Sequence, residues 1–291
     1  MTYRPRHRQR RRGGCLIRAL TFLLLIGLLA YPFLEPFMLE TETVSLTSDH
    51  LPRDVGQLRV AYLSDIHAGP FFSQSRVEKL ISAVNRLNAD IVLLGGDYAN
   101  DCDGAIEFFK HMPRINSRYG VYAVMGNHDR TIPEGNLFTL KSAMISAGVT
   151  PLVNDVASVR IGASNIYLAG LDDVDNGWPK LNEVAAQVRQ EDYVIFLSHS
   201  PAAIPEAHKA KDMNGRNMWF DLGLFGHTHG GQIALVGNLL NITKVEPRYE
   251  EGWLTENRTN LLISRGVGTS VLPIRLLNKP QIHLINIRST Q

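Results

Sequence analysis

The hydrophobic positions of this chain fall into short runs of branched and aromatic residues, and each run stops at a cluster of polar side chains. The runs cover residues 58–63, 91–94, 121–125, 193–197 and 221–225. Runs of this length that are bounded by glycine and polar residues are typical of buried strands. Because Asp, Asn or His follows each run, the strand ends can deliver ligand-type side chains to one edge of a sheet.

Helical patterns lie between these runs. Residues 75–87 place five apolar side chains on one helix face, and residues 138–148 space Leu140, Met144 and Ile145 as on one apolar helix face. A weaker helical pattern covers residues 181–190. Strands that alternate with helices predict a layered α/β fold.

The C-terminal third has a different pattern. Residues 260–266, 274–278 and 281–287 are predicted to be successive strands without helices between them, and residues 159–170 are predicted to form a hairpin. In the last strand, alternate residues are apolar on both faces, so both faces need cover. Two sheets that both need cover predict a sandwich flanked by helices.

The N-terminal segment contains an uncharged apolar run at residues 19–34, which reaches back to Leu16 if Arg18 extends to the membrane interface. That length approaches the roughly 20 residues needed to cross a bilayer. A cleaved signal peptide is the alternative, but no cleavage site of small residues follows, so a retained anchor is favoured. The arginines before the run predict a cytoplasmic N-terminus and an extracytoplasmic body. The expected organisation is a basic cytoplasmic tail (1–18), a transmembrane anchor (19–38), a linker or edge strand (39–56) and one folded domain (57–291).

The composition of the chain excludes some classes of partner and site but does not identify a reaction. The formal charge of +2 hides seven arginines within residues 1–18, without which 23 basic residues face 28 acidic ones, a net charge of −5. An acidic body argues against nucleic acid as a partner. The two cysteines, Cys15 and Cys102, form neither a disulfide framework nor a zinc-type pair.

The polar residues after the strands form a set of oxygen and imidazole donors without thiolates. The set is Asp65, His67, Asp97, Asn127, His199, His227 and His229. Such donors suit divalent ions such as Mn, Zn or Fe. Seven ligands are too many for one ion but fit two ions that share a carboxylate. A pair of ions with a bridging hydroxide is suited to in-line attack on phosphorus. His227 and His229, crowded into a glycine-flanked bend, are expected to serve different ions.

The motifs SDIH, GGDY, GNHD, SHSP and GHTHGGQ occur in this order, and together they resemble the calcineurin-like metallophosphoesterase superfamily over residues 57–291. Five motifs in order are far more specific than any one alone. With SRGVGTS and PIR near the end, the chain is similar to the bacterial branch of YkuE- and YaeI-type phosphodiesterases, which is related to membrane-anchored UDP-2,3-diacylglucosamine pyrophosphatases. The resemblance implies a four-layer αββα sandwich of two mixed sheets flanked by helices.

The resemblance also implies a role for each site residue. The first ion site is formed by Asp65, His67 and His229. The second is formed by Asn127, His199 and His227, and Asp97 is the carboxylate that bridges the two ions. His128 is not a ligand and is expected to protonate or steady the leaving oxygen. Asp129 is expected to orient His128.

The expected function is hydrolysis of a phosphodiester or pyrophosphate bond on a lipid-linked or cell-envelope substrate, with UDP-2,3-diacylglucosamine-like molecules among the candidates. The body is expected outside the cytoplasm, where UDP-linked lipids are scarce, so topology and that candidate conflict. The sequence GGDYANDCDG lacks the VDRG form of phosphoprotein phosphatases, which argues against that activity. The alternative is a catalytically silent scaffold or receptor with the same fold, although retention of every ligand favours an enzyme.

For residues outside the motifs, the sequence supports less specific predictions. Residues 171–178, where acids lie beside a tryptophan, are expected at the mouth of the site. The sequence DCDG at residues 101–104 is similar to the start of a calcium loop but lacks the closing glutamate. Four histidines without a ligand-like context are expected to be structural, namely His50, His111, His208 and His283.

Overall fold

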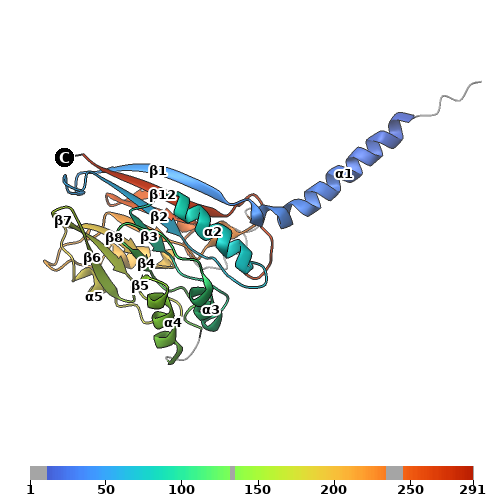
Figure 1. The fold of residues 1–291 in the computed structure, drawn as a ribbon. Coiled ribbons are helices and arrows are strands. Elements are labelled where there is room, and N and C mark those ends of the chain that lie inside the picture. The colour runs from blue at the N-terminus through green and yellow to red at the C-terminus, as the bar shows by residue number, and fades with distance from the viewer. Residues whose placement is uncertain (1–11, 132–134, 234–244, 291) are drawn as a thin grey trace, which may run out of the picture.

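Two mixed six-stranded sheets form the body of the protein, and a long helix, α1 (Arg12–Leu34), extends away from it (Figure 1). The computed structural model describes residues 12–131, 135–233 and 245–290. The strands of the first sheet are, in sheet order, β1 (Glu40–Ser48), β12 (Gln281–Ser289), β2 (Gln57–Leu63), β3 (Ile91–Leu94), β4 (Val121–Ala123) and β5 (Val149–Pro151). Within it, β12 and β2 are antiparallel and the other neighbours are parallel.

The second sheet has the same number of strands. They are, in sheet order, β10 (Gly252–Glu256), β11 (Thr259–Ile263), β9 (Leu222–Phe225), β8 (Tyr193–Leu197), β7 (Ser164–Gly170) and β6 (Asp155–Ile161). Both edge pairs are antiparallel, and the central strands are parallel. The predicted hairpin at residues 159–170 is therefore confirmed as part of the β6–β7 pair.

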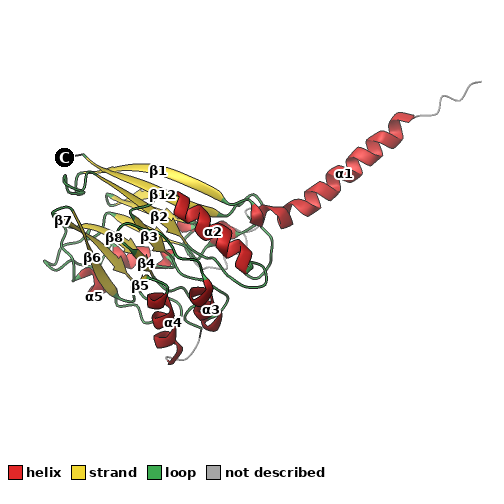
Figure 2. Cartoon of the chain, viewed as in Figure 1, coloured by secondary structure: helices red, strands yellow, loops and turns green. Residues whose placement is uncertain are grey.

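Helices cover the outer face of each sheet (Figure 2). The helices packed on the first sheet are α2 (Gln74–Arg86), α3 (Cys102–His111) and α4 (Gly135–Ser146), and those packed on the second are α5 (Leu181–Ala185) and α6 (Ile204–Ala207). A third hydrophobic cluster fills the space between the sheets. The predicted four-layer αββα sandwich is confirmed.

Alternation along the strands explains the layers. In β12, Ile282 packs in the outer cluster beneath the helices, whereas Ile285 and Ile287 pack between the sheets. Successive strand residues point to opposite faces, so a strand that is apolar at every core position must be covered on both sides. The pattern of residues 281–287 predicted this two-sided burial correctly.

The segment predicted to be a linker or edge strand belongs to the first sheet. Strand β1 pairs in parallel with β12 along its whole length, from Glu40 to Ser48. It alternates between half-buried and exposed residues, as an edge strand with one covered face should. The folded body therefore begins before residue 57, because β1 starts at Glu40 and a short helix (Glu35–Phe37) links it to α1.

The stretch Leu16–Phe37 is long and apolar enough to cross a membrane, judged by its length and composition, and its most apolar 18-residue window is not buried inside the protein. Its last turn is attached to the body by specific contacts. The fully buried carboxylate of Glu35 accepts hydrogen bonds from the backbone N–H groups of Leu277 (2.8 Å) and Asn278 (2.6 Å). The N–H of Arg275 donates to the carbonyl of Pro32 at 3.0 Å. These bonds fix the base of the helix to the body.

The prediction of a strand at residues 274–278 is wrong. Among the described residues, this segment forms one isolated bridge, from Leu276 to Ile233, and otherwise runs as a loop. The reason is Arg275, whose fully buried guanidinium donates to the carbonyls of Gly268 and Arg265 and satisfies the loop internally. Strand β10 was not predicted, because its residues are only half-buried.

The structure also explains two local features of the sequence. The sequence DCDG begins α3 rather than a calcium loop, because the Asp101 carboxylate accepts the N–H of Gly104 at 2.7 Å and caps the helix. On α4, Met144 is fully buried, but the neighbouring Ile145 is 64% exposed, so the two do not share a face.

The opposite environments of Met144 and Ile145 give a matched test of the fold. Met144→Ala should lower the free energy of unfolding by about 2–5 kcal/mol, because it leaves a cavity beneath α4. Ile145→Ala should change it by less than about 0.5 kcal/mol, since its side chain faces water. Urea denaturation of both variants measures the difference, and equal losses would contradict the orientation of α4.

Candidate metal centre

Most of the predicted ligands lie immediately after strand ends and adopt an unusual backbone conformation. Five of the seven predicted ligands have positive φ angles, namely Asp65 (55°), His67 (48°), Asp97 (55°), His227 (70°) and His229 (53°). A left-handed conformation costs a non-glycine residue roughly 1–2 kcal/mol. Strain of this kind is concentrated at functional sites, where it aims side chains that a relaxed loop would point elsewhere.

The glycines of the motifs leave room for the ligand carboxylates. A Cβ atom on Gly126 would lie 2.1 Å from Oδ1 of Asp97, and one on Gly226 would lie 2.3 Å from Oδ2 of Asp65. Neither distance is compatible with a side chain. The GNHD and GHTHGGQ motifs therefore contain glycine because backbone must approach these two carboxylates closely.

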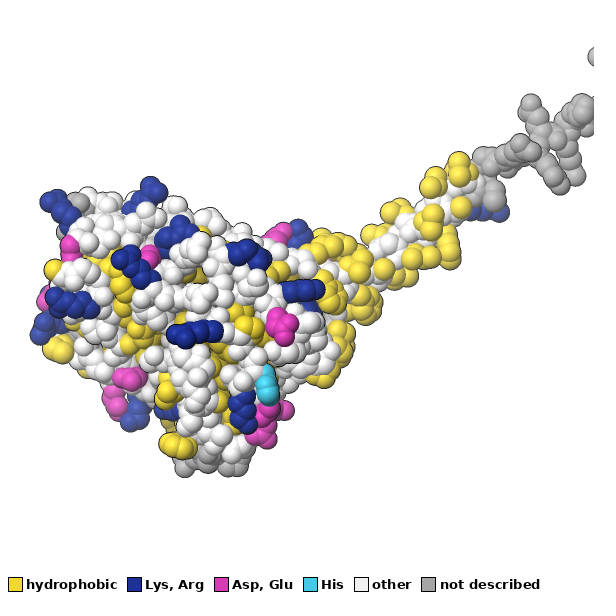
Figure 3. Space-filling view, in the orientation of Figure 1, with side chains coloured by type: hydrophobic (Ala, Val, Ile, Leu, Met, Phe, Trp, Pro, Cys, Tyr) yellow, Lys and Arg dark blue, Asp and Glu magenta, His cyan; other side chains and the backbone are white. Residues whose placement is uncertain are grey.

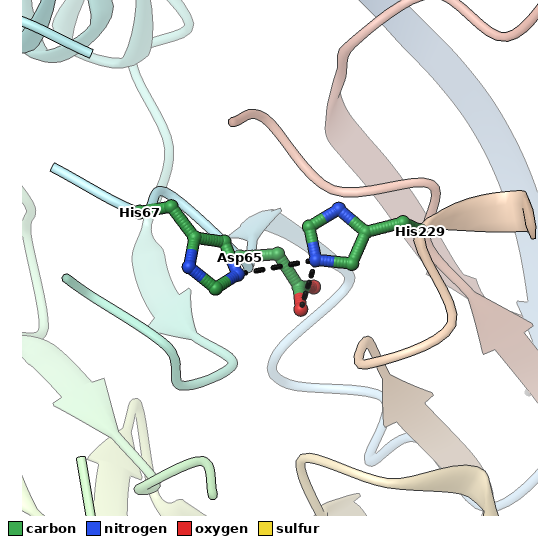
Figure 4. Close-up of side chains that lie close together, drawn as sticks. All are labelled: Asp65, His67 and His229. Carbon is green, nitrogen blue, oxygen red and sulfur yellow. Dashed lines mark hydrogen bonds and ion pairs between the residues drawn. The ribbon is translucent and has the colours of Figure 1, made fainter. Parts of the chain in front are cut away.

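One group of donors combines Asp65 with two histidines from loops far apart in the sequence. Nε2 of His67 lies 3.1 Å from Nε2 of His229, which in turn lies 3.5 Å from Oδ1 of Asp65. Figure 4 shows the two imidazole rings pointing toward each other beside the carboxylate. All three residues are buried. This group coincides with the set expected for the first ion.

A second group forms around Asp97. Nε2 of His199 lies 3.3 Å from Oδ2 of Asp97 and 4.0 Å from Oδ1 of Asp65. Nε2 of His67 lies 3.6 Å from the same Oδ2 of Asp97. Asp97 thus stands between a histidine of each expected ion site, where a bridging carboxylate would have to be.

The two remaining predicted ligands complete the cluster. Oδ1 of Asn127 lies 3.0 Å from Nδ1 of His227, and the rings of His227 and His199 lie 5.1 Å apart. The backbone N–H of His227 donates to both oxygens of the Asp65 carboxylate, at 3.0 and 3.1 Å. The structure therefore brings all seven predicted residues into one cluster.

Hydrogen bonds to the far side of two rings leave Nε2 available as a ligand atom. Nδ1 of His199 lies 2.8 Å from the carbonyl oxygen of Gly95, and Nδ1 of His67 lies 3.1 Å from Oδ1 of Asn100. A ring that donates its Nδ1–H presents a lone pair on Nε2, as metal-bound histidines do. Nε2 of His199 is buried and has no hydrogen-bond partner, so the site fits a cation there.

Asn100 is a residue that sequence reasoning missed. Besides its side-chain contact with His67, its backbone carbonyl lies 2.8 Å from Nδ1 of His128. One residue thus fixes two imidazoles on neighbouring loops. Its signal in the sequence is slight, because it lies three residues beyond Asp97 in the otherwise irregular stretch GGDYAN.

The expected pairing of Asp129 with His128 is corrected by the structure. The Asp129 carboxylate accepts three backbone N–H groups, from Asp97 (2.7 Å), Gly126 (2.8 Å) and Tyr98 (3.1 Å). It therefore holds together the loops after β3 and β4 rather than the His128 ring. The backbone N–H of His128 donates instead to Oδ1 of Asp97 at 2.9 Å.

Burial and charge set the protonation of the cluster. Burial lowers the pKa of His67, and burial together with the nearby charge of His67 lowers the pKa of His229, so both imidazoles favour the neutral form that binds metal. Burial would also lower the pKa of His199, but the charge of Asp97 outweighs this and raises it well above the ordinary value. In turn, His199 lowers the pKa of Asp97 despite its burial.

Residues 171–178 reach the edge of the cluster, as expected. Oδ2 of Asp175 lies 3.7 Å from Nε2 of His227, and the side-chain amide of Asn176 donates to the carbonyl of Asn127 at 2.9 Å. Behind them, Arg130 forms a buried ion pair with Asp172, with 3.1 Å between Nε and Oδ1. This ion pair ties the segment to the loop that carries Asn127 and His128.

The four histidines expected to be structural make contacts away from the cluster. His50 pairs with Asp221, and buried His283 lies between Ser264 and Glu42. His111 pairs with Glu107 on α3, and His208 lies near Glu256. Both of these carboxylates lie outside the candidate metal centre.

The chain matches the calcineurin-like phosphoesterase family over residues 58–231 and belongs to that family. Members of the family use a dinuclear metal centre, and the clustered donors are the candidate ligands here.

Relatives extend the match over most of the chain. It is 29% identical over 265 residues to the uncharacterized metallophosphoesterase YkuE of Bacillus subtilis (strain 168), covering 89% of this chain and 88% of that protein. It is 30% identical over 264 residues to a Bos taurus transmembrane protein with metallophosphoesterase domain, covering 82% of this chain and 55% of that protein. A solved dimetal phosphatase from Danio rerio is similar at 12% identity with a TM-score of 0.43, covering 72% of this chain and 88% of that one. The resemblance to the YkuE-type branch is confirmed.

The corrected position of Asp129 predicts a structural effect that does not depend on metal. Asp129→Ala should lower the free energy of unfolding by about 2–5 kcal/mol, because buried N–H groups lose their acceptor. Glu78→Ala, at an exposed position on α2, is the control and should change it by less than about 0.5 kcal/mol. Denaturation in EDTA measures both, and an unchanged Asp129→Ala protein would show that the three bonds contribute nothing.

Proposed function

We propose that the protein is a dinuclear, metal-dependent phosphoesterase that hydrolyses a phosphodiester or pyrophosphate bond. The observation that carries the proposal is the convergence of three imidazole Nε2 atoms, from His67, His199 and His229, on the carboxylates of Asp65 and Asp97. Two buried carboxylates within reach of imidazole nitrogens form a site for divalent cations.

The roles of the residues follow from the two groups. Asp65, His67 and His229 would hold one ion, Asn127, His199 and His227 would hold the other, and Asp97 would bridge them. Mn, Zn and Fe all suit this mixture of oxygen and nitrogen donors. Bound ions of this kind supply an activated water and neutralise the charge on the phosphate oxygens.

His128 is placed to assist the leaving group. Its Nδ1 faces the carbonyl of Asn100, so Nδ1 donates and Nε2 is the atom free to exchange a proton with substrate. The ring packs edge-on against His67, with centroids 4.9 Å apart. A leaving oxygen held at the metal centre would therefore lie beside this imidazole.

The apolar helix supports a role at a membrane. We infer that α1 anchors the protein as a single-pass membrane protein, which agrees with the name of the Bos taurus relative, a transmembrane protein with metallophosphoesterase domain. The arginines before the helix favour a cytoplasmic N-terminus and an extracytoplasmic body. A lipid-linked or cell-envelope phosphoester is then the substrate class most accessible to the site.

A catalytically silent scaffold with this fold would need neither ions nor Asp97. Elemental analysis of the purified protein separates the two functions, because an enzyme of this type should carry close to two divalent ions per chain. A metal-free protein without phosphoesterase activity would favour the scaffold.

The bridging role of Asp97 predicts a large effect on catalysis. Asp97→Asn should reduce Mn-dependent cleavage of bis-p-nitrophenyl phosphate by at least about 10²-fold, because the shared ligand loses its charge. Asp103→Asn, which changes an exposed carboxylate on α3, is the matched control and should leave the rate unchanged. Full turnover in Asp97→Asn would end the assignment.

The raised pKa of His199 predicts proton release on metal binding. Because the pKa lies above the ordinary value, His199 is protonated in the metal-free protein at pH 7, and a cation must displace that proton to bind Nε2. Calorimetric titration of EDTA-treated protein with Mn²⁺ at pH 7, in buffers with different ionisation enthalpies, should show release of about one proton. A binding enthalpy independent of the buffer would contradict this.

A further inference from the structure

Exposed apolar side chains surround the point where α1 joins the body. Five of them come from three separate segments and are defined here as the apolar collar: Phe37 (66% exposed), Phe71 (49%), Val271 (91%), Leu272 (52%) and Leu277 (62%). Figure 3 shows hydrophobic side chains continuing from α1 onto the adjoining part of the body.

Specific bonds hold the segments of the collar around the helix end. The Arg76 guanidinium donates to the carbonyls of Pro36 and Phe71 and lies 4.4 Å from the centre of the Phe37 ring. On another side, the N–H of Leu277 donates to the buried Glu35 carboxylate at 2.8 Å. The collar is therefore a built feature of the junction and not a chance scatter of apolar residues.

Two collar residues are held outward against their backbone preference. Val271 has a φ angle of 61° and Leu277 one of 57°. A left-handed conformation is disfavoured for any non-glycine residue and most of all for a β-branched one such as Val271. Strained backbone that presents an apolar side chain to the outside is expected where that side chain meets a partner.

The collar adjoins the metal centre through two loops. Phe71 follows His67 by four residues, and Ala68 between them is fixed by a bridge to Ala99. On the other side, Gln232 follows His229 by three residues, and its side-chain amide donates to the carbonyls of Ser270 and Leu272, at 3.0 Å each. The loops that supply two expected ligands thus continue into the collar.

The length of the apolar stretch indicates what covers the collar. Leu16–Phe37 has 22 residues, which as a helix would extend roughly 33 Å, close to the roughly 30 Å of a bilayer's hydrocarbon core. The stretch ends at Phe37, itself a member of the collar. A bilayer that holds the helix therefore reaches its interface at the height of the collar.

We propose that the apolar collar inserts into the interface of the bilayer that α1 crosses, so that the metal centre opens at the level of the lipid headgroups. The substrate is then a phosphoester in the headgroup of a lipid of the same leaflet, an assignment that rests on the proposed function. Hydrolysis there transfers water to phosphorus and releases the esterified alcohol, while the lipid phosphate stays in the membrane.

Depth-dependent fluorescence quenching tests the insertion directly. The full chain would be reconstituted into phosphatidylcholine vesicles with brominated acyl chains, with tryptophan introduced as Leu272→Trp. Leu25→Trp within α1 is the reference for full insertion, and Ile145→Trp on α4 is the matched exposed control. Relative to vesicles without bromine, the added tryptophan of Leu272→Trp should be quenched at least about twofold more than that of Ile145→Trp. Equal quenching at the two positions, or no quenching of Leu25→Trp, would overturn the proposal.

Kinetics on two substrates with the same leaving group test the consequence. The double variant Val271→Asp/Leu272→Asp should raise the KM for the p-nitrophenyl ester of phosphatidic acid in vesicles by about tenfold, because charge opposes insertion. Its kcat/KM for soluble bis-p-nitrophenyl phosphate should not change, since neither side chain belongs to the metal centre. The control Phe138→Asp/Ile145→Asp, at exposed positions on α4, should alter neither value.

The outcomes separate docking from catalysis. An unchanged KM in vesicles, or equal losses on both substrates, would overturn the role of the collar. If the unaltered protein cleaves neither substrate although Leu272→Trp is quenched, the proposed function fails while the membrane contact stands. Cleavage of the soluble ester alone by the unaltered protein would overturn the lipid substrate.

Discussion

The arrangement of this protein depends on the burial of several carboxylates at one edge of its sheets. Asp65, Asp97 and Asp129 are each at most 2% exposed, and a buried carboxyl group is costly unless its oxygens receive hydrogen bonds or its charge is paired. The protein compensates them differently. Asp129 receives three backbone amides, Asp65 receives the amide of His227, and Asp97 is paired with His199. Asp65 and Asp97 also face the Nε2 atoms of His67, His199 and His229, and this mixture of oxygen and nitrogen donors suits divalent cations.

The strained backbone of the ligand loops depends on the stability of the two covered sheets. Left-handed backbone at the ligand positions costs free energy, and the stability for it must come from elsewhere. Three separate hydrophobic clusters, two beneath helices and one between the sheets, provide that stability. The parallel strands of both sheets end at the same edge, so the rigid core also fixes where the strained loops begin.

The sequence predicted the elements whose signal is local and periodic. The strand runs ended where the structure ends them to within a few residues, and the donors that follow them meet, because parallel strands deliver their ends to a common edge. Predictions that depended on side-chain partners did worse. Nothing in the spacing of GNHD shows that Asp129 accepts backbone amides from the loops after β3 and β4, or that Asn100 contacts two imidazoles. Residues 274–278 were predicted to be a strand because most of them are apolar. The hydrogen bonds from the buried Arg275 guanidinium to loop carbonyls, which hold this segment as a loop, cannot be read from a local pattern.

The junction with α1 joins the apolar helix to one half of the candidate metal centre. Glu35 binds the backbone of Asn278, whose side-chain amide donates to the backbone carbonyls of His229 and Gly230. His229 belongs to the group with Asp65 and His67, whereas the Asn127–His227 pair is braced from the other side by residues 171–178. The two halves of the centre therefore have different supports, and the half joined to Asn278 is the one linked through Glu35 to the base of α1. Both of these links are buried, so the base of α1 and the loop that carries His229 are held by the same residue, Asn278.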